Sequence, residues 1–453
     1  MTRPDLSQMT LEEKDALILA LLKRIEDLEA RLGGGPPKTP DNSSVPPSRG
    51  QKRNRPPREK KPRKKRDGPG TTRTLAENPD RIVDSHAETC AHCGTALPEA
   101  AQSLRHAYDH IDLPPMRPIV TRVRLFGCRC PHCRRRARGA PPEAMQPGSP
   151  FGDTILAMLA YLHHHHAIAY ERLARLMGEL FGLSISEGAI ANALKRVGAR
   201  LEPATDAIRE TIRTADVVGC DETGARLTTD EAGTRMAWEW VAVTKTAVYH
   251  HIAPSRGAAV VRDIMGEHRP RCWVSDRWSA QQGHAETQQI CLAHVLRDVQ
   301  YAIDAREPAF APALRRLLQW TIRVGRRRDD LKDSTLRRYY VTAERRLDQV
   351  LTIPVTTAAG QKLLAQTKRW RGSFFTFLRD RDVPPTNNES ERALRPSVIF
   401  RKVTNGFRSA WGAQTHARTR SVIGTGRLNG IPAHQAISRA LAGHALFPAR
   451  PTP

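Results

Sequence analysis

The segment from residue 36 to residue 70 most constrains the architecture of this 453-residue chain. It holds nine prolines and 12 lysines and arginines, against three acidic residues and almost no apolar side chains. Such a segment cannot bury enough surface to fold alone. It therefore separates a short N-terminal part from a long C-terminal part. The basic run from Arg49 to Arg66 is either a solvated linker or an arm that contacts nucleic-acid phosphates without reading sequence.

A heptad repeat marks the N-terminal part. Its first apolar position is filled by Leu11, Ile18, Ile25 and Leu32, and its second by Leu21 and Leu28. β-Branched residues at the first position favour two strands. The pattern predicts a coiled coil within residues 1–35 that pairs two chains. The alternative is an amphipathic helix that packs on its own chain.

The charge of the chain points to its class of partner. Lysine and arginine number 72 against 47 aspartates and glutamates, so the net charge is +25. This excess favours nucleic acid over an anionic membrane surface. The longest strongly apolar run, Ile155–Leu162, is far shorter than the roughly 20 residues that span a bilayer, which excludes an integral membrane protein. Without a secretory signal at the N-terminus, we expect a cytoplasmic location.

Five of the eight cysteines lie between Cys90 and Cys133, which is typical of metal ligation in a reducing compartment. Two C-x-x-C pairs each turn two thiolates toward one point. Together, Cys90, Cys93, Cys130 and Cys133 predict a closed, structural Zn²⁺ site within residues 76–148. The 36 residues between the pairs exceed the usual spacing and leave room for a hairpin. Cys128 competes for one ligand position, and His92 or His132 can substitute.

Residues 149–210 have helical periodicity. Two helices, Tyr170–Phe181 and Glu187–Leu201, are joined by a glycine-containing turn, which fits a helix-turn-helix shape or plain helical packing. The run from His163 to His166 is compatible with a metal cluster. However, consecutive residues of a helix point in different directions, so we interpret this run as an exposed polar turn.

Beyond residue 215 the apolar period changes to two, and residues 290–380 then become helical and strongly basic. The predicted strands are Val217–Cys220, Met236–Val243, Ala247–Ile252 and Cys272–Ser275. Asp221 and Asp276 each follow an apolar strand. Carboxylates in an incomplete ligand shell suit Mg²⁺ or Mn²⁺. A third carboxylate from a later helix would complete a two-metal site for phosphoryl transfer.

Several motifs occur in a fixed order along the chain. They are KTPDNSSVPPS at Lys38–Ser48, LPP at Leu113–Pro115, CDETGARL at Cys220–Leu227, PSRG at Pro254–Gly257, VSDRWSA at Val274–Ala280, CLAHVLRD at Cys291–Asp298, TNNESERALRP at Thr386–Pro396 and RKVTNGFRS at Arg401–Ser409. With these motifs and the paired C-x-x-C module, the chain resembles the transposases of the insertion sequence 66 family of bacteria, from about residue 10 to residue 445.

The resemblance implies a DDE triad on an RNase H-like fold. By motif, the triad is Asp221, Asp276 and Glu391, while Glu389 is a rival that points about 200° away on a helix. Cys291 and His294 match a C-x-x-H feature of the family. We interpret them as support for the core or the active site rather than as zinc ligands.

One position departs from the family pattern. Where the family usually has a tyrosine after the second aspartate, this chain has Gln281.

The fold class expected is therefore a multidomain α+β protein. The expected parts are a coiled coil (1–35), a basic linker (36–75), a zinc-binding module (76–148), a helical DNA-binding segment (149–210), an RNase H-like catalytic core (211–300 and 381–453) and an α-helical insertion (301–380).

The expected activity is metal-dependent cleavage and strand transfer at the ends of an insertion sequence. The expected partners are double-stranded DNA, as terminal inverted repeats and target, a second copy of the chain or a higher oligomer, and accessory proteins encoded by the element. The alternatives are a non-catalytic, zinc-dependent DNA-binding regulator and a metal-dependent nuclease that cuts without joining.

Overall fold

The computed structural model describes residues 10–11, 14–15, 17–22, 35–43, 73–229 and 233–447. Residues 17–22 are helical, and the side chains of Ile18 and Leu21 are exposed. The rest of the predicted coiled-coil seam, from Ile25 to Leu32, and the basic run from Arg49 to Arg66 lie outside the described residues. Both therefore stay predictions.

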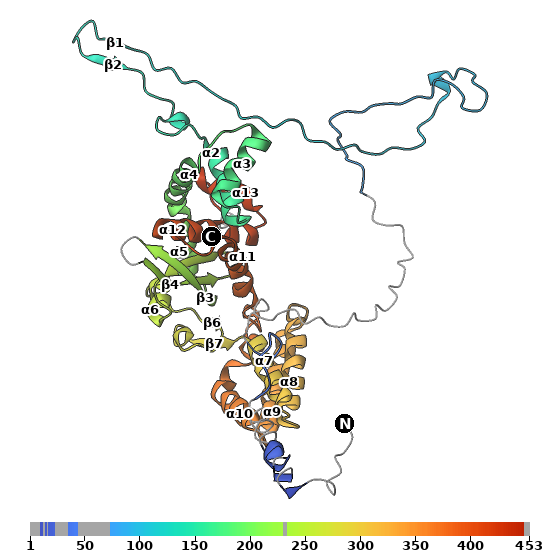
Figure 1. Ribbon diagram of the computed structural model, residues 1–453, viewed down its shortest axis with the longest axis vertical. Coiled ribbons are helices and arrows are strands. Elements are labelled where there is room, and N and C mark those ends of the chain that lie inside the picture. The colour runs from blue at the N-terminus through green and yellow to red at the C-terminus, as the bar shows by residue number, and fades with distance from the viewer. Residues whose placement is uncertain are drawn as a thin grey trace.

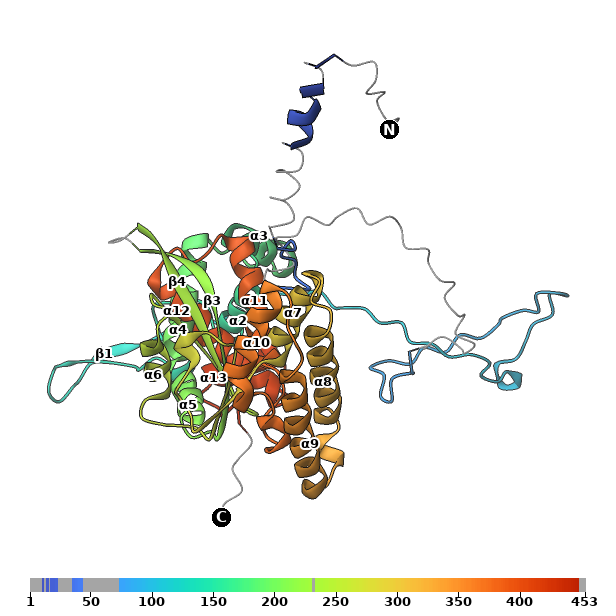
Figure 2. The same ribbon diagram turned by 90° about the horizontal axis from the view of Figure 1, so that it is seen from below.

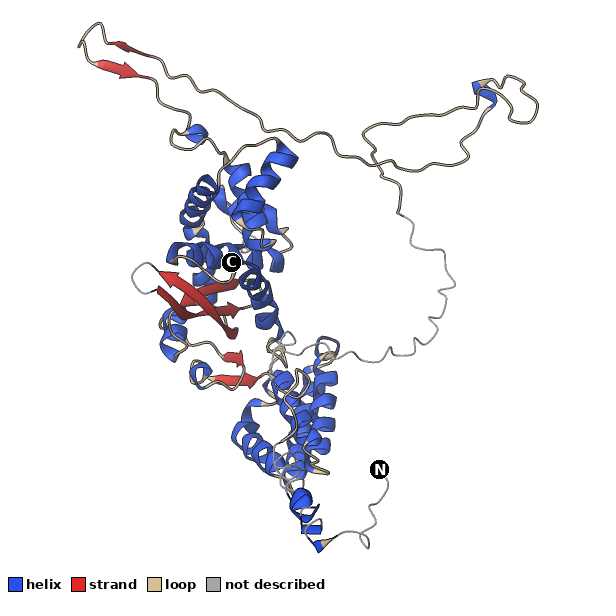
Figure 3. Cartoon of the chain, viewed as in Figure 1, coloured by secondary structure: helices blue, strands red, loops and turns tan. Residues whose placement is uncertain are grey.

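A five-stranded mixed sheet lies at the centre of the fold (Figures 1 and 3). Its strand order is β5-β4-β3-β6-β7, with β3 at Val217–Thr229, β4 at Gly233–Val243, β5 at Val248–Ala253, β6 at Cys272–Ser275 and β7 at Thr287–Ile290. Strands β3, β4 and β5 form an antiparallel meander, and β6 and β7 run parallel to β3. With helices on the sheet, this confirms the mixed α+β class.

Two C-terminal helices pack on the sheet. Helix α11 (Asn388–Thr404) lies against β3 and β4, and α12 (Ala410–Leu428) lies along β5. The free edge of β5 is closed by hydroxyl groups of α12. The amides of Val248 and His250 donate to Thr425 Oγ1 (3.0 Å) and Ser421 Oγ (2.8 Å). An edge strand protected in this way cannot pair with another chain.

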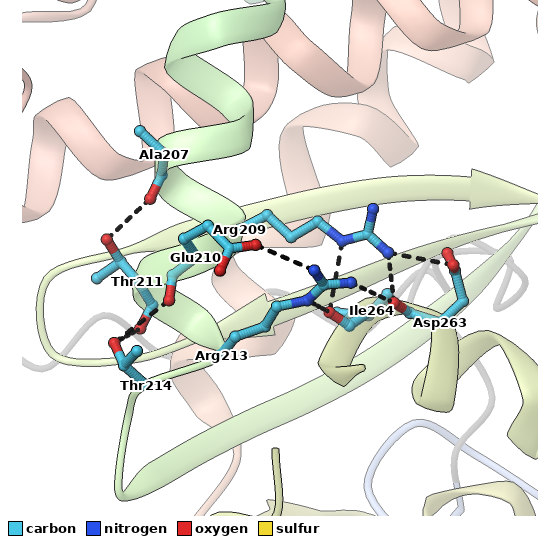
Figure 4. A network of polar contacts seen from close by, with 8 residues as sticks. All are labelled: Ala207, Arg209, Glu210, Thr211, Arg213, Thr214, Asp263 and Ile264. Atoms are coloured by element: carbon cyan, nitrogen blue, oxygen red, sulfur yellow. Dashed lines mark hydrogen bonds and ion pairs between the residues drawn. The ribbon is translucent and has the colours of Figure 1, made fainter. Parts of the chain in front are cut away.

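Two arginines, Arg209 within α5 (Glu202–Ile212) and Arg213 just after it, tie this helix to α6 (Ala258–Met265), which precedes β6 (Figure 4). Arg213 donates to the carbonyl oxygens of Asp263 and Ile264, each at 3.0 Å, and Arg209 forms an ion pair of 3.2 Å with the Asp263 carboxylate. These guanidinium groups satisfy carbonyls at the end of α6 that lack partners within the helix.

The helices before the sheet are α2 (Asp153–Ala160), a π-helical turn (Tyr161–His165), α3 (Tyr170–Phe181) and α4 (Glu187–Arg200). The predicted helix pair is confirmed to within one residue. Helix α3 ends at Gly182, whose φ of +63° favours glycine, and the Ser186 side chain caps α4. Leu194 of α4 belongs to the same buried cluster as Val218 of β3. Helix α13 (Ala433–Leu441) completes this core.

A second hydrophobic core lies between strands β6 and β7, at one edge of the sheet, and a group of helices beside them (Figures 1 and 2). It is built by α7 (Leu292–Asp304), α8 (Phe310–Gly325), α9 (Asp333–Leu351) and α10 (Ala358–Trp370). Short 3₁₀ helices occur at Glu99–Ala101, Glu143–Met145, Ser279–Gln281, Arg328–Asp330, Arg371–Ser373 and Thr376–Leu378. Among the described residues, no helix has both the length and the apolar character needed to cross a bilayer.

Candidate active site

The parallel pairing of β3 with β6 brings the two predicted aspartates to one level of the sheet. Val217 pairs with Cys272 and Gly219 with Val274. Asp221 and Asp276 each come two residues after this last pair, so they stand at the same level of the sheet. The prediction that Asp221 follows a strand is wrong, because β3 continues to Thr229 in its pairing with β4. Asp276 does follow β6 directly.

The start of α11 lies over the same face of β3. A side chain at Gly219 would bring its Cβ within 2.9 Å of Ser390 Oγ and 3.2 Å of Asn387 Oδ1, so glycine permits the close approach. Asn387 Nδ2 also donates to the carbonyl of Cys220 (2.7 Å). Asn387 is the N-cap residue of α11, but its side chain bonds to β3 rather than to the helix. Alternate residues of a strand share a face, so the side chain of Asp221 lies on the same face of β3 as Gly219, toward α11.

The two glutamates at the start of α11 have different surroundings. The Glu389 side chain is 49% exposed and forms ion pairs with Arg392 (2.6 Å) and Arg427 (3.5 Å). The Glu391 side chain is 19% exposed, and its Oε1 lies 3.9 Å from His294 Nε2 of α7. Glu391 is thus the glutamate that turns toward the sheet and α7.

Asp221 is half-buried and lies in a strongly negative environment. Burial, followed by the charges of Glu222 and Asp276 and more weakly that of Glu391, holds the pKa of Asp221 well above its ordinary value. Carboxylates that disfavour each other's ionisation in this way are relieved by a cation. The carboxylate oxygens of Asp221, Asp276 and Glu391 are of the type that Mg²⁺ or Mn²⁺ prefers, but within the described residues the ligand atoms of these three side chains do not all lie within 4.8 Å of one another.

Glu222, which was not among the predicted site residues, anchors a polar network on the other face of β3. Its carboxylate is nearly inaccessible and accepts hydrogen bonds from Arg256 Nε (3.0 Å) and Gln281 Nε2 (2.6 Å). Gln281 in turn accepts from Trp273 Nε1 (3.0 Å). The residue that departs from the family pattern therefore joins β3 to β6.

Two tryptophans extend this network to Asp276. The Arg256 guanidinium lies over the rings of Trp238 and Trp278, 4.6 and 4.0 Å from their centroids. The Trp278 amide donates to Asp276 Oδ1 (2.8 Å), which orients that carboxylate. Glu222, Arg256 and Trp278 lie in the motifs CDETGARL, PSRG and VSDRWSA, which are the sequence signals for the network.

Glu391 belongs to a second group of potential ligands. Among the described residues, the ligand atoms of Cys291, His294 and Glu391 lie within 4.8 Å of one another. The sequence interpretation gave Cys291 and His294 only a supporting role.

The four predicted zinc ligands form two separate turns. In one, the amide of Gly94 donates to the carbonyl of Cys90. In the other, the amide of Arg134 donates to the carbonyl of Cys130. This turn lies beside the short strands β1 (Gly127–Arg129) and β2 (Arg136–Arg138). Hydrogen bonds from Thr95 lower the pKa of Cys93, and those from Cys133 and His132 lower the pKa of Cys130.

Each turn therefore suits thiolate ligands, but the structure does not bring the two turns together (Figure 1). The segment between them is exposed, including Ile111, Ile119 and Phe126, so it has no apolar core of its own that would fold it.

The interpretation of His163–His166 as an exposed turn is wrong for its first half. His163 and His164 are buried, at 7% and 3% exposure, and only His166 is exposed. His164 Nδ1 lies 3.3 Å from His416 Nδ1, and His416 Nε2 lies 3.0 Å from Ser397 Oγ of α11. Consecutive residues of a helix are about 100° apart and can share a broad buried face, as Leu156 and Ala157 do in α2, so the different directions of the histidines did not require exposure.

Comparison with known proteins finds one matching family and several similar solved structures. The family described as "Transposase IS66 family" matches residues 148–415, more than half of the chain. Among solved structures, the Mos1 strand transfer complex matches at 13% identity and a TM-score of 0.12, over 33% of this chain and 60% of that chain. The Mos1 transposase paired-end complex with left transposon end matches at 13% identity and a TM-score of 0.11, over 33% and 61%. No curated protein matches.

Proposed function

Because the chain belongs to the IS66 family of transposases, we propose that it is a DDE transposase, which cleaves DNA at the ends of an insertion sequence and joins them to target DNA. The order of the sheet, an antiparallel meander followed by two parallel strands, supports an RNase H-like catalytic core. The observation that carries the proposal is the burial of Asp221 among the charges of Glu222, Asp276 and Glu391. Such a cluster destabilises a protein and is retained where it serves a metal-dependent reaction.

The three carboxylates have distinct supports in the proposed mechanism. Asp221 is held by the interior of β3, Asp276 by the amide of Trp278, and Glu391 by the start of α11, which Asn387 fastens to β3. Together they would hold two Mg²⁺ or Mn²⁺ ions. When bound, the metals supply an activated water or 3′-hydroxyl and stabilise the charge that develops on the phosphate. The fixed carboxylates orient the attacking oxygen for in-line displacement.

Basic surfaces would hold the DNA. The insertion carries exposed arginines on α8, on α9 and between them: Arg315, Arg316, Arg323, Arg326, Arg327, Arg337 and Arg338. Such side chains bind phosphates of any sequence and make affinity depend on salt. The helical segment at 149–210 and the cysteine module would recognise the terminal repeats, and the run from Arg49 to Arg66 would add phosphate contacts.

The test compares the two glutamates of α11. A duplex that contains one end of the element is incubated with Mg²⁺ and each variant, and cleavage and joining are measured. We expect Glu391→Gln to abolish both while DNA binding persists, because a neutral amide is a poor ligand for Mg²⁺. Glu389→Gln, the matched control two residues away, should keep most of the activity.

Two results of this comparison would count against the proposal. Full activity in Glu391→Gln, beside a dead Glu389→Gln, would move the third ligand to the exposed face of α11. Cleavage without any joining in the wild type would favour a nuclease over a transposase.

A further inference from the structure

The N-terminus of α7 presents two potential metal ligands to Glu391. Cys291 is the N-cap residue of α7, and His294 follows one turn later, so both lie on the same side of the helix. Glu391 approaches them from α11. The ligand atoms of the three residues lie within 4.8 Å of one another, although Glu391 is almost 100 positions away in the sequence.

Two of the three side chains carry buried atoms without a partner. His294 Nδ1 and Glu391 Oε1 are both inaccessible and have no hydrogen-bond partner among the described residues. The distance of 3.9 Å between His294 Nε2 and Glu391 Oε1 is too long for a hydrogen bond. It is close to the separation of about 3.3 Å expected for two ligands of a tetrahedral Zn²⁺ ion. Buried polar atoms in native proteins are rarely left unpaired, so Glu391 Oε1, which faces His294 Nε2 across this gap, calls for a ligand.

We propose that Cys291, His294 and Glu391 form a Zn²⁺ site that competes with Mg²⁺ for Glu391. A thiolate and an imidazole are ligands that Zn²⁺ accepts and Mg²⁺ does not. With three protein ligands, the fourth position of the ion stays open. The inhibitory consequence rests on the proposed function, because Zn²⁺ would withdraw the third carboxylate from the magnesium site and so inhibit DNA cleavage.

Cys291 offers a substitution that leaves the surrounding contacts in place. Its Sγ accepts a hydrogen bond from the amide of Asn387 (3.2 Å), which a serine hydroxyl can also accept. The Cys291→Ser variant therefore keeps the link between α7 and α11 while it removes the thiolate. Cys272 of β6 is a matched control, because it is equally buried but belongs to no group of potential ligands among the described residues.

The first experiment measures binding and does not depend on activity. Co²⁺, which reports thiolate ligation by its charge-transfer absorbance, is titrated into the metal-free full-length chain. We expect Cys291→Ser to bind one Co²⁺ fewer than the wild type and to lose the corresponding part of the absorbance. Cys272→Ser should match the wild type. His294→Gln, as a second variant, should weaken the same site.

A Cys291→Ser variant with wild-type stoichiometry and absorbance would overturn the proposal. Circular dichroism checks that each variant is folded, and if Cys291→Ser does not fold, His294→Gln decides by the same two readouts.

The second experiment tests the competition. Zn²⁺ is added to the Mg²⁺-dependent cleavage of an end-containing duplex. We expect the Zn²⁺ concentration for half-inhibition to rise by about tenfold or more in Cys291→Ser and to stay unchanged in Cys272→Ser. Equal inhibition of all three proteins would overturn the competition. A wild type that binds Co²⁺ at this site but cleaves no DNA would instead count against the proposed transposase activity.

Discussion

At the scale of single residues, Asp221 is placed where its charge is unfavourable. It is half-buried in β3, and loss of solvent together with the charges of neighbouring carboxylates raises its pKa. A carboxyl group whose pKa is higher in the folded than in the unfolded chain lowers stability, and the loss increases as the pH rises above the unfolded pKa of about 3.9. In the absence of divalent metal, the charge of Asp221 should therefore lower the free energy of unfolding.

We predict that Asp221→Asn raises the melting temperature of the metal-free protein at pH 7.5. The amide has nearly the same shape as the carboxylate but removes the buried charge, so a gain of about 1–2 kcal/mol in the free energy of unfolding is expected. Differential scanning calorimetry in a chelator measures it. Glu389→Gln, at an exposed position, should leave the melting temperature nearly unchanged. A lower melting temperature for Asp221→Asn would show that the charge is compensated in the folded protein.

The residues of the candidate site differ in how far the sequence could reveal them. Asp221 and Asp276 follow from their type and their position on apolar strands, and Glu391 follows from the family motif. Glu222 lies in the same motif as Asp221 but points to the opposite face of β3, where its partner Arg256 is supplied by a separate motif. Their pairing depends on how β3 packs, which residue type and spacing do not specify.

At the scale of elements, apolar periodicity predicted where most strands occur better than it predicted where they end. Strand β3 extends nine residues beyond its predicted end at Cys220, because the antiparallel partner β4 supports a ribbon whose far half is only partly buried. Strand β7 was missed, since Thr287-Gln-Gln-Ile290 has only one apolar residue. The side chain of Gln289 is buried there because Phe374 and Phe377 provide backbone partners.

The histidines of the π-helical turn join this element to α11 and α12. Burial holds the pKa of His164 and of His416 well below the usual 6.5, and it lowers the pKa of His165 to about 4. These rings are therefore neutral in the folded protein, whereas the unfolded chain binds protons below about pH 6.5. The stability that they contribute is full above that pH and is lost as the pH falls toward 4.

We predict that the free energy of unfolding falls between pH 6.5 and pH 5. The expected slope is about 1.4 kcal/mol per pH unit for each of His164 and His416. Urea unfolding at several pH values measures it. His416→Gln should flatten the dependence, while the exposed His110→Gln should not. An unchanged slope in His416→Gln would mean that the loss of stability arises elsewhere.

The two cysteine turns carry the prediction of a structural Zn²⁺ site. We predict that purified protein retains about one Zn²⁺ per chain through these turns after dialysis against a weak chelator, because metal binding supplies the folding free energy of such modules. The double variant Cys93→Ala, Cys130→Ala should lose this ion, as measured by elemental analysis. Cys128→Ala is the matched control and should keep it. Full zinc content in the double variant would refute the four-cysteine assignment.

At the scale of the whole molecule, the proposed function assigns different tasks to the C-terminal part and to the N-terminal heptads. A transposase must bring two DNA ends together, and the charges of Asp276 and Glu391 act on one residue, Asp221, in the described part of the chain. The segment at 35–43 docks on the insertion, where Asn42 Nδ2 donates to Asp304 Oδ2 of α7 (2.9 Å). This contact fixes residues that follow the heptads in the sequence to the helical part of the structure. A second copy of the chain is the partner that their pattern favours.

The last prediction tests this pairing. Ile18 is 52% exposed and Leu11 is 80% exposed, so within the described residues the apolar positions of the first heptads have little cover from their own chain. The double variant Ile18→Lys, Ile25→Lys places two charges in the predicted seam and should convert a dimer into a monomer, as measured by light scattering. Ala16→Lys with Ala30→Lys adds the same charge outside the seam and should leave the mass unchanged. If the seam variant keeps the dimeric mass, the contact between chains lies in the catalytic body, and the heptads instead pack on their own chain.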